Sequence, residues 1–243
     1  MDEIRRSADA HPPPAPPGPA PVPRRAEPLP GDRETGGVVW YASYGSNMHA
    51  SRLAYYIEGG RPPGGTRTYP GCRDRRRPQL AVPVLLPGLL YFALESPVWG
   101  GGMGFYDPAQ DGEMPARAYL VTAGQFSDIA AQEMRREPGT DLDLSRALSA
   151  GRDRLGPGRY QTLVCAGALD GIPVCTFTAP WTLADADLNA PSAAYLRNFA
   201  GGLAEAHGWG PARSAEYLAT RPGAAGRWTA RSVLDAIGGG SGT

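Results

Sequence analysis

The chain has 243 residues, enough for one sizeable domain or two small ones, and its 42% of hydrophobic residues allows a packed core. Basic and acidic residues number 24 each, so the formal net charge is zero, and every basic residue in that count is an arginine. This balance gives no indication of a nucleic acid or an anionic membrane as partner.

The cysteines and the apolar segments predict a soluble cytoplasmic protein. Cys72, Cys165 and Cys175 are an odd, sparse set without CxxC spacing, which argues against a disulfide scaffold. The N-terminus lacks the apolar region of a secretory signal. The longest apolar run, residues 80–90, is interrupted by prolines and is too short to span a bilayer. We therefore expect neither a membrane nor a nucleic-acid partner.

The two ends of the chain differ in composition from the rest. Ten of the 26 prolines fall between Pro12 and Pro30, and residues 1–36 carry almost no large apolar side chain. Such a segment cannot bury enough surface to offset its ordering entropy, so we expect a disordered, Pro-rich arm over residues 1–36. An inert arm is favoured over an SH3-type ligand. Residues 238–243 predict a flexible tail, which leaves one continuous domain over residues 37–237.

Within this domain, strand patterns dominate the first half and helical patterns the end. In chain order, the sequence predicts strands at Val38–Tyr44, Leu90–Glu95 and Ala116–Thr122, a helix at Gly124–Arg136, strands at Tyr160–Ala166 and Val174–Ala179, and helices at Ala193–His207, Ala212–Thr220 and Thr229–Ile237. This order predicts an α+β fold, in which a small curved mixed β-sheet or barrel has flanking helices.

The first predicted strand ends in a loop that has the features of an anion-binding cradle. Gly45 permits backbone angles that other residues resist, and successive N–H groups there can converge on an anionic oxygen. Ser46 and Asn47 add side-chain donors, and from Met48 an apolar helical segment closes the loop. The alternative is a connecting turn in which Ser46 or Asn47 only caps the next helix.

The helix predicted at residues 124–136 carries a glutamate on its apolar face. Thr122 and Gln125 have capping-box spacing at its start. Phe126 and Ile129 begin an inward stripe, and Glu133, seven residues after Phe126, returns to the same face. The other polar residues of the helix are expected to point elsewhere: Asp128, Gln132, Arg135 and Arg136.

An inward carboxylate is expensive to ionise, because desolvation disfavours its charged form. Its pKa rises toward the working range of a general acid or base. The alternative is a glutamate at the edge of the stripe, paired with Arg136 or with Arg117 on the preceding strand.

Four motifs, taken in order, resemble the gamma-glutamylcyclotransferase-like family. The string Tyr44-Gly45-Ser46-Asn47-Met48 is similar to the family's Y-G-S-N-[LM] signature. Residues 99–102 (WGGG) resemble its W-x-G-G segment, Gln132-Glu133 its helical Q-E pair, and residues 192–195 (SAAY) its S-x-x-Y region. The likeness covers roughly residues 38–221.

This resemblance implies a metal-independent enzyme without a cofactor, acting on a small gamma-glutamyl compound. It assigns substrate binding to the loop Tyr44–Met48 and the catalytic acid/base role to Glu133. It also implies that Trp99, Gly101 and Phe177 line the pocket. In the family reaction the substrate's own amine attacks its γ-carbonyl, which releases 5-oxoproline. Arg117 and Phe177 depart from the family's pattern and put the leaving-group side of the pocket in doubt.

Other classes of protein fit the sequence less well. A zinc-dependent deacetylase or amidohydrolase needs clustered ligands, whereas His49 and His207 lie far apart without HxH or HExxH spacing. A serine hydrolase needs a second glycine after Ser46. A non-catalytic binding module of the same fold stays open, although an inward glutamate argues for catalysis. The sequence leaves the oligomeric state and the particular gamma-glutamyl compound undetermined.

Overall fold

The computed structural model describes residues 22–28, 37–63, 65 and 67–239. Its strands are β1 (Arg24–Arg25), β2 (Val38–Ser43), β3 (Ala81–Pro87), β4 (Leu89–Ala93), β5 (Met103–Asp107), β6 (Glu113–Thr122), β7 (Arg152–Arg154), β8 (Thr162–Leu169) and β9 (Ile172–Thr178). Its α-helices are α1 (Ala50–Glu58), α2 (Ala123–Glu133), α3 (Ser145–Ala150), α4 (Ala193–His207), α5 (Pro211–Ala219) and α6 (Ala230–Gly238), and two short 3₁₀ helices are η1 (Ser46–Met48) and η2 (Leu183–Asp185).

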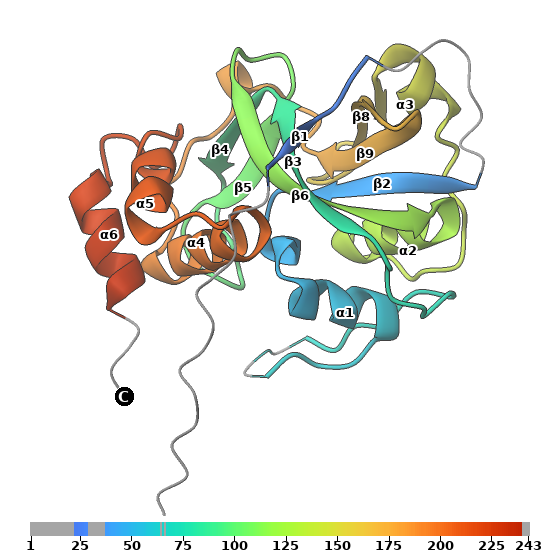
Figure 1. Cartoon of the computed structure of the whole chain (residues 1–243), viewed down its shortest axis with the longest axis horizontal. Coiled ribbons are helices and arrows are strands. Elements are labelled where there is room, and N and C mark those ends of the chain that lie inside the picture. Colours follow the sequence, from blue (N-terminus) through green and yellow to red (C-terminus); the bar gives the residue numbers. More distant parts are fainter. Residues whose placement is uncertain (1–21, 29–36, 64, 66, 240–243) are drawn as a thin grey trace, which may run out of the picture.

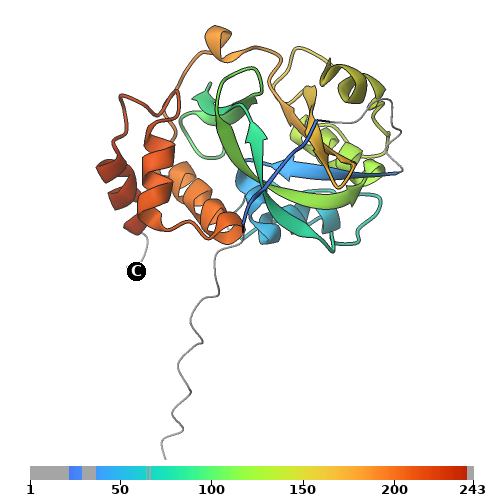
Figure 2. The ribbon, with the colours of Figure 1, turned by 45° about the horizontal axis from the view of Figure 1, so that its top comes forward.

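Seven strands form one mixed sheet in the order β1-β3-β6-β2-β9-β8-β7, and β4 and β5 form a separate hairpin. The central strand β2 is antiparallel to β6 and parallel to β9. Helices flank this sheet, with α4 to α6 grouped at one side (Figure 1 and Figure 2). The predicted α+β fold with a mixed sheet and flanking helices is therefore confirmed.

Alternation along β2 divides the core between the two faces of the sheet. Trp40 and Ala42 pack in a cluster that includes residues of α4, α5 and α6. Val39 and Tyr41 point to the opposite face and pack with residues of α1, α2 and α3. Because β2 is buried on both faces, it is the rigid element at whose end a site can be built.

Residues 22–28 differ from the predicted disordered arm. Arg24 and Arg25 pair in parallel with β3, and the backbone of Glu27 exchanges two hydrogen bonds with Ala168 of β8. This segment therefore joins strands near opposite edges of the sheet, and an ion pair from Arg24 to Asp170 (2.5 Å) lies beside it. Residues 1–21 and 29–36 of the predicted arm, and 240–243 of the predicted tail, lie outside the described residues.

Three further strands and one helix have no counterpart in the sequence prediction: β3, β5, β7 and α3. Pro83 lies inside β3 and argues against a strand by pattern. The proline is tolerated because β1 pairs only with Val84 and Leu85, so that β3 is a sheet edge at residue 83. In the part of the chain that the structure describes, no helix has the length and apolar character needed to cross a membrane.

Candidate active site

A cavity of about 400 Å³ opens where β2 ends, between the sheet, α1, α2 and the N-terminal part of α4. Most of the predicted site residues line it: Tyr44, Gly45, Ser46, Asn47, Trp99, Glu133 and Phe177. Two predicted residues do not. Met48 is buried in the core, and Gly101 packs against a neighbouring backbone segment.

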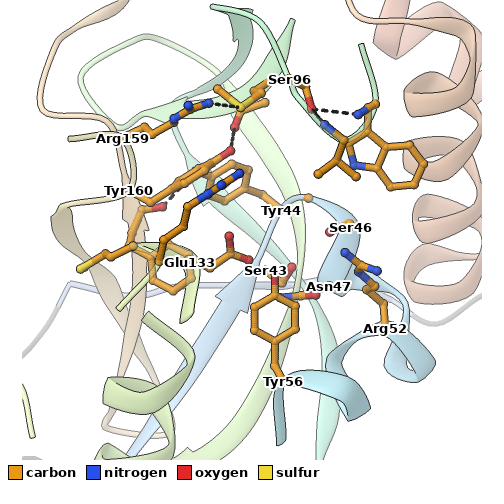
Figure 3. A pocket seen from close by; sticks show the side chains of 18 of the residues that line it. Ser43, Tyr44, Ser46, Asn47, Arg52, Tyr56, Ser96, Glu133, Arg159 and Tyr160 are labelled. Carbon is orange, nitrogen blue, oxygen red and sulfur yellow. Dashed lines mark hydrogen bonds between the residues drawn. The ribbon is translucent and has the colours of Figure 1, made fainter. Parts of the chain in front are cut away.

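Glu133 is the last residue of α2 and the only acidic residue among the described residues that line the cavity. The predicted capping box at the start of this helix is present, since the side chains of Thr122 and Gln125 each accept a hydrogen bond from the other's backbone N–H. The cap and the buried Phe126 fix the rotation of α2. Glu133 is half-buried, because its side chain lies in the cavity (Figure 3).

Burial raises the pKa of the Glu133 carboxyl above its usual value. A hydrogen bond with the Tyr56 hydroxyl opposes this rise. So do the positive charges of three nearby side chains, Arg52, Arg67 and Arg135, without cancelling it. No basic side chain of the described residues lies within ion-pair distance of this carboxyl, and Arg117 pairs instead with Glu205. The carboxyl is therefore held in the cavity without a fixed counter-ion.

The other polar residues of α2 correct part of the sequence prediction. Asp128 and Gln132 do not point away from the core, since both side chains are fully buried. Asp128 accepts hydrogen bonds from the backbone N–H and Nε of Arg73, and Gln132 donates through Nε2 to the Tyr56 carbonyl. Asp128 is therefore paired with the loop of residues 72–77, whereas the buried Oε1 of Gln132 has no hydrogen-bond partner among the described residues.

The loop after β2 forms one wall of the cavity. Gly45 adopts φ −120° and ψ −141°, after which Ser46–Met48 make one 3₁₀ turn. The Met48 N–H donates to the Gly45 carbonyl, so this donor is used within the turn. The N–H groups of Ser46 and Asn47 are the first of the turn and have no partner within it, as at any helix start. The cradle therefore consists of Gly45, Ser46 and Asn47, and Met48 is not part of it.

Two residues of β6 hold the far end of this turn. The Tyr119 hydroxyl lies 2.9 Å from the Asn47 carbonyl and 3.1 Å from the Met48 carbonyl. Arg117 also donates to the Met48 carbonyl, at 3.1 Å, and pairs with Glu205 of α4. Arg117 therefore lies behind the loop, and it is not among the residues that line the cavity.

Side chains around Glu133 supply further polar groups. Asn47 donates through Nδ2 to the Tyr41 hydroxyl at 3.4 Å, whereas its buried Oδ1 has no hydrogen-bond partner among the described residues. Burial raises the pKa of both Tyr41 and Tyr56, and the nearby charge of Glu133 raises each further. Both phenols are therefore neutral donors at physiological pH. Figure 3 shows the ring of Tyr56 next to Ser43 and Glu133.

The glycine-rich motif and the S-x-x-Y motif build the opposite wall together. Ser192 caps α4 and donates through Oγ to the Trp99 carbonyl at 2.7 Å. Trp99 stacks on Tyr195, with ring centroids 5.5 Å apart. A Cβ on Gly101 would lie 2.4 Å from the Ala190 carbonyl oxygen, so this glycine permits a close backbone approach. Gly101 therefore packs against this segment, and the prediction that it lines the pocket is wrong.

Several residues that line the cavity were not predicted from the sequence: Tyr41, Arg52, Tyr56, Arg67, Arg135, Arg159 and Tyr160. The alternation of β2 places Tyr41 two residues before Ser43 and could have indicated it. The arginines come from α1 and from irregular segments, where no periodic pattern exists to indicate them.

Among the described residues there is no group of three or more His, Cys, Asp or Glu side chains that could hold a metal ion. The thiols of Cys72, Cys165 and Cys175 are unpaired by disulfides.

Comparison with known proteins gives three kinds of result. No protein-family model matches the chain. Among curated proteins, the chain is similar to histone deacetylase 5 of Arabidopsis thaliana, with 31% identity over 185 residues that cover 69% of this chain. The match spans only 28% of the length of that plant protein.

Three solved structures are similar at low identity. A gamma-glutamyl cyclotransferase shares 15% identity at a TM-score of 0.45, with 84% of this chain and 99% of that chain covered. An uncharacterized human protein, loc79017, gives the same identity and TM-score over 83% of this chain and 99% of its own. YkqA of Bacillus subtilis gives 16% identity and a TM-score of 0.36 over 77% of this chain and 56% of its own.

Proposed function

We propose that the chain is a gamma-glutamylcyclotransferase-type enzyme, which releases 5-oxoproline from a gamma-glutamyl amine or amino acid. The observation that carries the proposal is that Glu133 and the loop Gly45–Asn47, each singled out in the sequence, line the same cavity. The order of the four motifs along the chain supports it further. The cytoplasmic location, the absence of a cofactor and the independence from metal ions expected from the sequence belong to the same proposal.

The proposed reaction is an internal aminolysis. The α-amine of the substrate attacks its own γ-carbonyl carbon, a C–N bond forms, and a five-membered lactam closes. The bond from the γ-carbon to the departing nitrogen then breaks. Because the nucleophile belongs to the substrate, the protein has to hold the chain in a curled conformation, stabilise the oxyanion and move one proton.

Glu133 is the group that moves this proton. Its ionised carboxylate takes the proton that the α-ammonium group loses, and its protonated form delivers that proton to the departing nitrogen. The rise in its pKa through burial suits both steps, since the carboxyl exchanges a proton more readily near neutral pH than an exposed glutamate does. The absence of an ion pair at this carboxyl, within the described residues, fits a group that changes charge during turnover.

The loop supplies the donors in this scheme. The N–H groups of Ser46 and Asn47 begin a helical turn and have no partner in it, so they suit a carbonyl oxygen that gains negative charge. Tyr119 and Arg117 hold the carbonyls at the other end of the turn. A fixed loop does not have to reorganise as the charge develops.

We do not extend the deacetylase activity named for the plant relative to this chain. The match spans only 28% of that protein, and neither histidine nor cysteine is found among the described residues that line the cavity. A non-catalytic binding module of the same fold is the remaining alternative, and it predicts binding of a gamma-glutamyl compound without release of 5-oxoproline.

The proposal is tested with the purified chain and a panel of gamma-glutamyl compounds, half with amine and half with amino-acid leaving groups. Release of 5-oxoproline is followed by mass spectrometry, with and without a chelator. We expect turnover of at least one compound, undiminished by the chelator. Binding without release would favour the binding module, and loss of turnover on chelation would contradict the metal-independent mechanism.

A further inference from the structure

Four arginines line the cavity, against the single carboxyl of Glu133: Arg52, Arg67, Arg135 and Arg159. None of them forms an ion pair with a carboxylate in the part of the chain that the structure describes. Arg135 and Arg159 are exposed, whereas Arg52 and Arg67 are half-buried. The cavity wall therefore carries an excess of positive charge that the protein itself does not neutralise, and a ligand with a negative group would compensate it.

Arg52 and Arg67 converge on one aromatic ring. The Cζ atom of Arg52 lies 5.3 Å from the centroid of Tyr69, and that of Arg67 lies 4.8 Å from it. The two residues come from α1 and from the segment after it, fifteen positions apart in the sequence. Like charges would separate in water, so their approach to the same ring indicates that the fold holds them in place.

Neutral groups fix both guanidinium groups. One terminal nitrogen of Arg52 donates to the Tyr69 hydroxyl at 2.7 Å, and one of Arg67 donates to the Gln132 carbonyl at 2.9 Å. Each guanidinium carries five N–H donors, so these bonds leave donors over for a ligand. The buried Nε of Arg52 has no hydrogen-bond partner among the described residues. Two guanidinium groups that are held in place and have unused N–H donors are suited to bind a carboxylate.

Figure 3 shows Arg52 beside Ser46 and Asn47, on the side of the cavity where the loop lies, with Arg159 on the other side of Glu133 in that view. A gamma-glutamyl substrate has one carboxylate on its glutamyl half, and this carboxylate is on the same carbon as the attacking amine. An anion held next to the loop therefore fixes the carbon whose amine must reach the γ-carbonyl.

We propose that Arg52 and Arg67 bind the α-carboxylate of the gamma-glutamyl group, and that the loop N–H groups serve the γ-carbonyl oxygen instead. This assignment rests on the proposed function. Binding of the α-carboxylate and stabilisation of the γ-carbonyl oxygen are then performed by different groups. Without the arginines, the loop Gly45–Asn47 would have to bind one or the other. It makes a free α-carboxylate, rather than the leaving amine, the main determinant of binding.

The test uses L-gamma-glutamyl methylamide and its analogue in which the α-carboxylate is a carboxamide, so that the two ligands differ only at the proposed contact. Binding is measured by calorimetry to the E133Q variant, which is expected not to turn the ligand over. We expect the carboxylate to bind about 10- to 100-fold more tightly, as for hydrogen bonds between charged groups. Arg52→Met and Arg67→Met should each weaken binding of the carboxylate and leave binding of the carboxamide unchanged.

The matched control is Arg61→Met, because Arg61 is an exposed arginine of the same segment and does not line the cavity. It should bind both ligands as the parent protein does, and thermal unfolding of each variant shows whether the fold is retained. Equal binding of the two ligands, binding of neither, or a preference that survives both substitutions would overturn the assignment. Failure of the proposed function gives a different result. In that case the wild-type chain releases no 5-oxoproline, even if it still binds the carboxylate more tightly than the carboxamide.

Discussion

The hydroxyl of Tyr119 donates a hydrogen bond to the carbonyl oxygen of Asn47 at 2.9 Å. This contact joins the middle of the sheet to the 3₁₀ turn that follows β2. It is made to the C-terminal end of the turn, whereas Gly45 and Ser46 at the N-terminal end line the cavity, where the first N–H groups have no partner within the turn. The sheet thus orients the donors that the proposed reaction needs.

Tyr119→Phe should loosen this turn without unfolding the protein. The substitution removes the hydroxyl that donates to the Asn47 carbonyl, whereas the Met48 carbonyl keeps its hydrogen bond from Arg117. A lost hydrogen bond of this kind costs about 1–3 kcal/mol when a buried partner stays unsatisfied. We expect a lower free energy of unfolding in urea and a several-fold lower kcat for 5-oxoproline release. Tyr55→Phe on α1 serves as the control, since its hydroxyl has no hydrogen-bond partner among the described residues. Wild-type stability and turnover in Tyr119→Phe would contradict the orienting role.

Gly45→Ala and Gly102→Ala should separate a site glycine from a packing glycine. A Cβ at Gly45 would lie 3.9 Å from the Tyr195 hydroxyl, which is an ordinary contact, and the φ of Gly45 suits any residue. The added methyl group fits the fold but lies by the cradle, so we expect normal stability and weaker substrate binding. A Cβ at Gly102 would lie 2.0 Å from the Asn189 carbonyl oxygen, and such overpacking costs about 1–3 kcal/mol.

Thermal unfolding and KM, measured on both glycine variants, check this pair. If Gly45→Ala loses stability as Gly102→Ala does, the loop glycine is a packing residue and the cradle assignment is weakened.

Asp128→Ala should destabilise α2 and the two loops that its carboxylate joins. This buried carboxylate accepts from the backbone N–H and Nε of Arg73 and from the N–H of Gly139. Because the Arg73 side chain is half exposed, solvent can take over part of these interactions. We therefore expect a loss of about 1–3 kcal/mol, below the range for a fully buried pair. Urea denaturation measures this loss, and a value near zero would contradict the anchoring role.

The raised pKa of Glu133 predicts a pH-dependent gain in stability for E133Q. The folded state binds a proton at this carboxyl more readily than the unfolded state, whose pKa is near 4.5. Stability therefore falls as the pH rises from about 4.5 through the folded pKa, and the loss persists at higher pH. The E133Q variant has no ionisable carboxyl at this position and does not lose stability in this way. By calorimetry, the Tm of the variant should exceed that of the wild type at pH 8, and the difference should shrink toward pH 4. An equal Tm at both pH values would contradict the burial of this carboxyl.

The strongest local patterns predicted the elements that bear the site. The run of β-branched and aromatic residues at positions 38–44 predicted a buried strand, and the capping box of Thr122 and Gln125 fixed the start of α2. From this start, the helical period predicted that Glu133 lies on the inward face of α2, and its side chain does lie in the cavity. The same period misplaced Asp128 and Gln132, because a helix covered on several sides buries polar groups that bond to the segments packed on it, here the loop at Arg73 and helix α1.

Features that depend on contacts between distant segments could not be predicted from the sequence. Residues 22–28 have the composition of a disordered chain, yet pairing with β3 and with Ala168 of β8 orders them. The position of Arg52 relative to Arg67 depends on how the segment after α1 folds back toward Tyr69, and no periodicity encodes that path. Gly101 matched a motif, but its role follows from a close approach to Ala190, far along the chain.

The most direct measurement is the rate of 5-oxoproline release by E133Q, compared with E137Q and the wild type on the best substrate of the panel. Glu137 is an exposed glutamate four residues after Glu133, outside the cavity, so E137Q controls for the loss of one carboxylate. We expect kcat/KM of E133Q to fall on the order of a hundredfold or more, as for removal of a general acid or base, with E137Q unchanged. Near-normal turnover by E133Q would contradict the proposed role of Glu133.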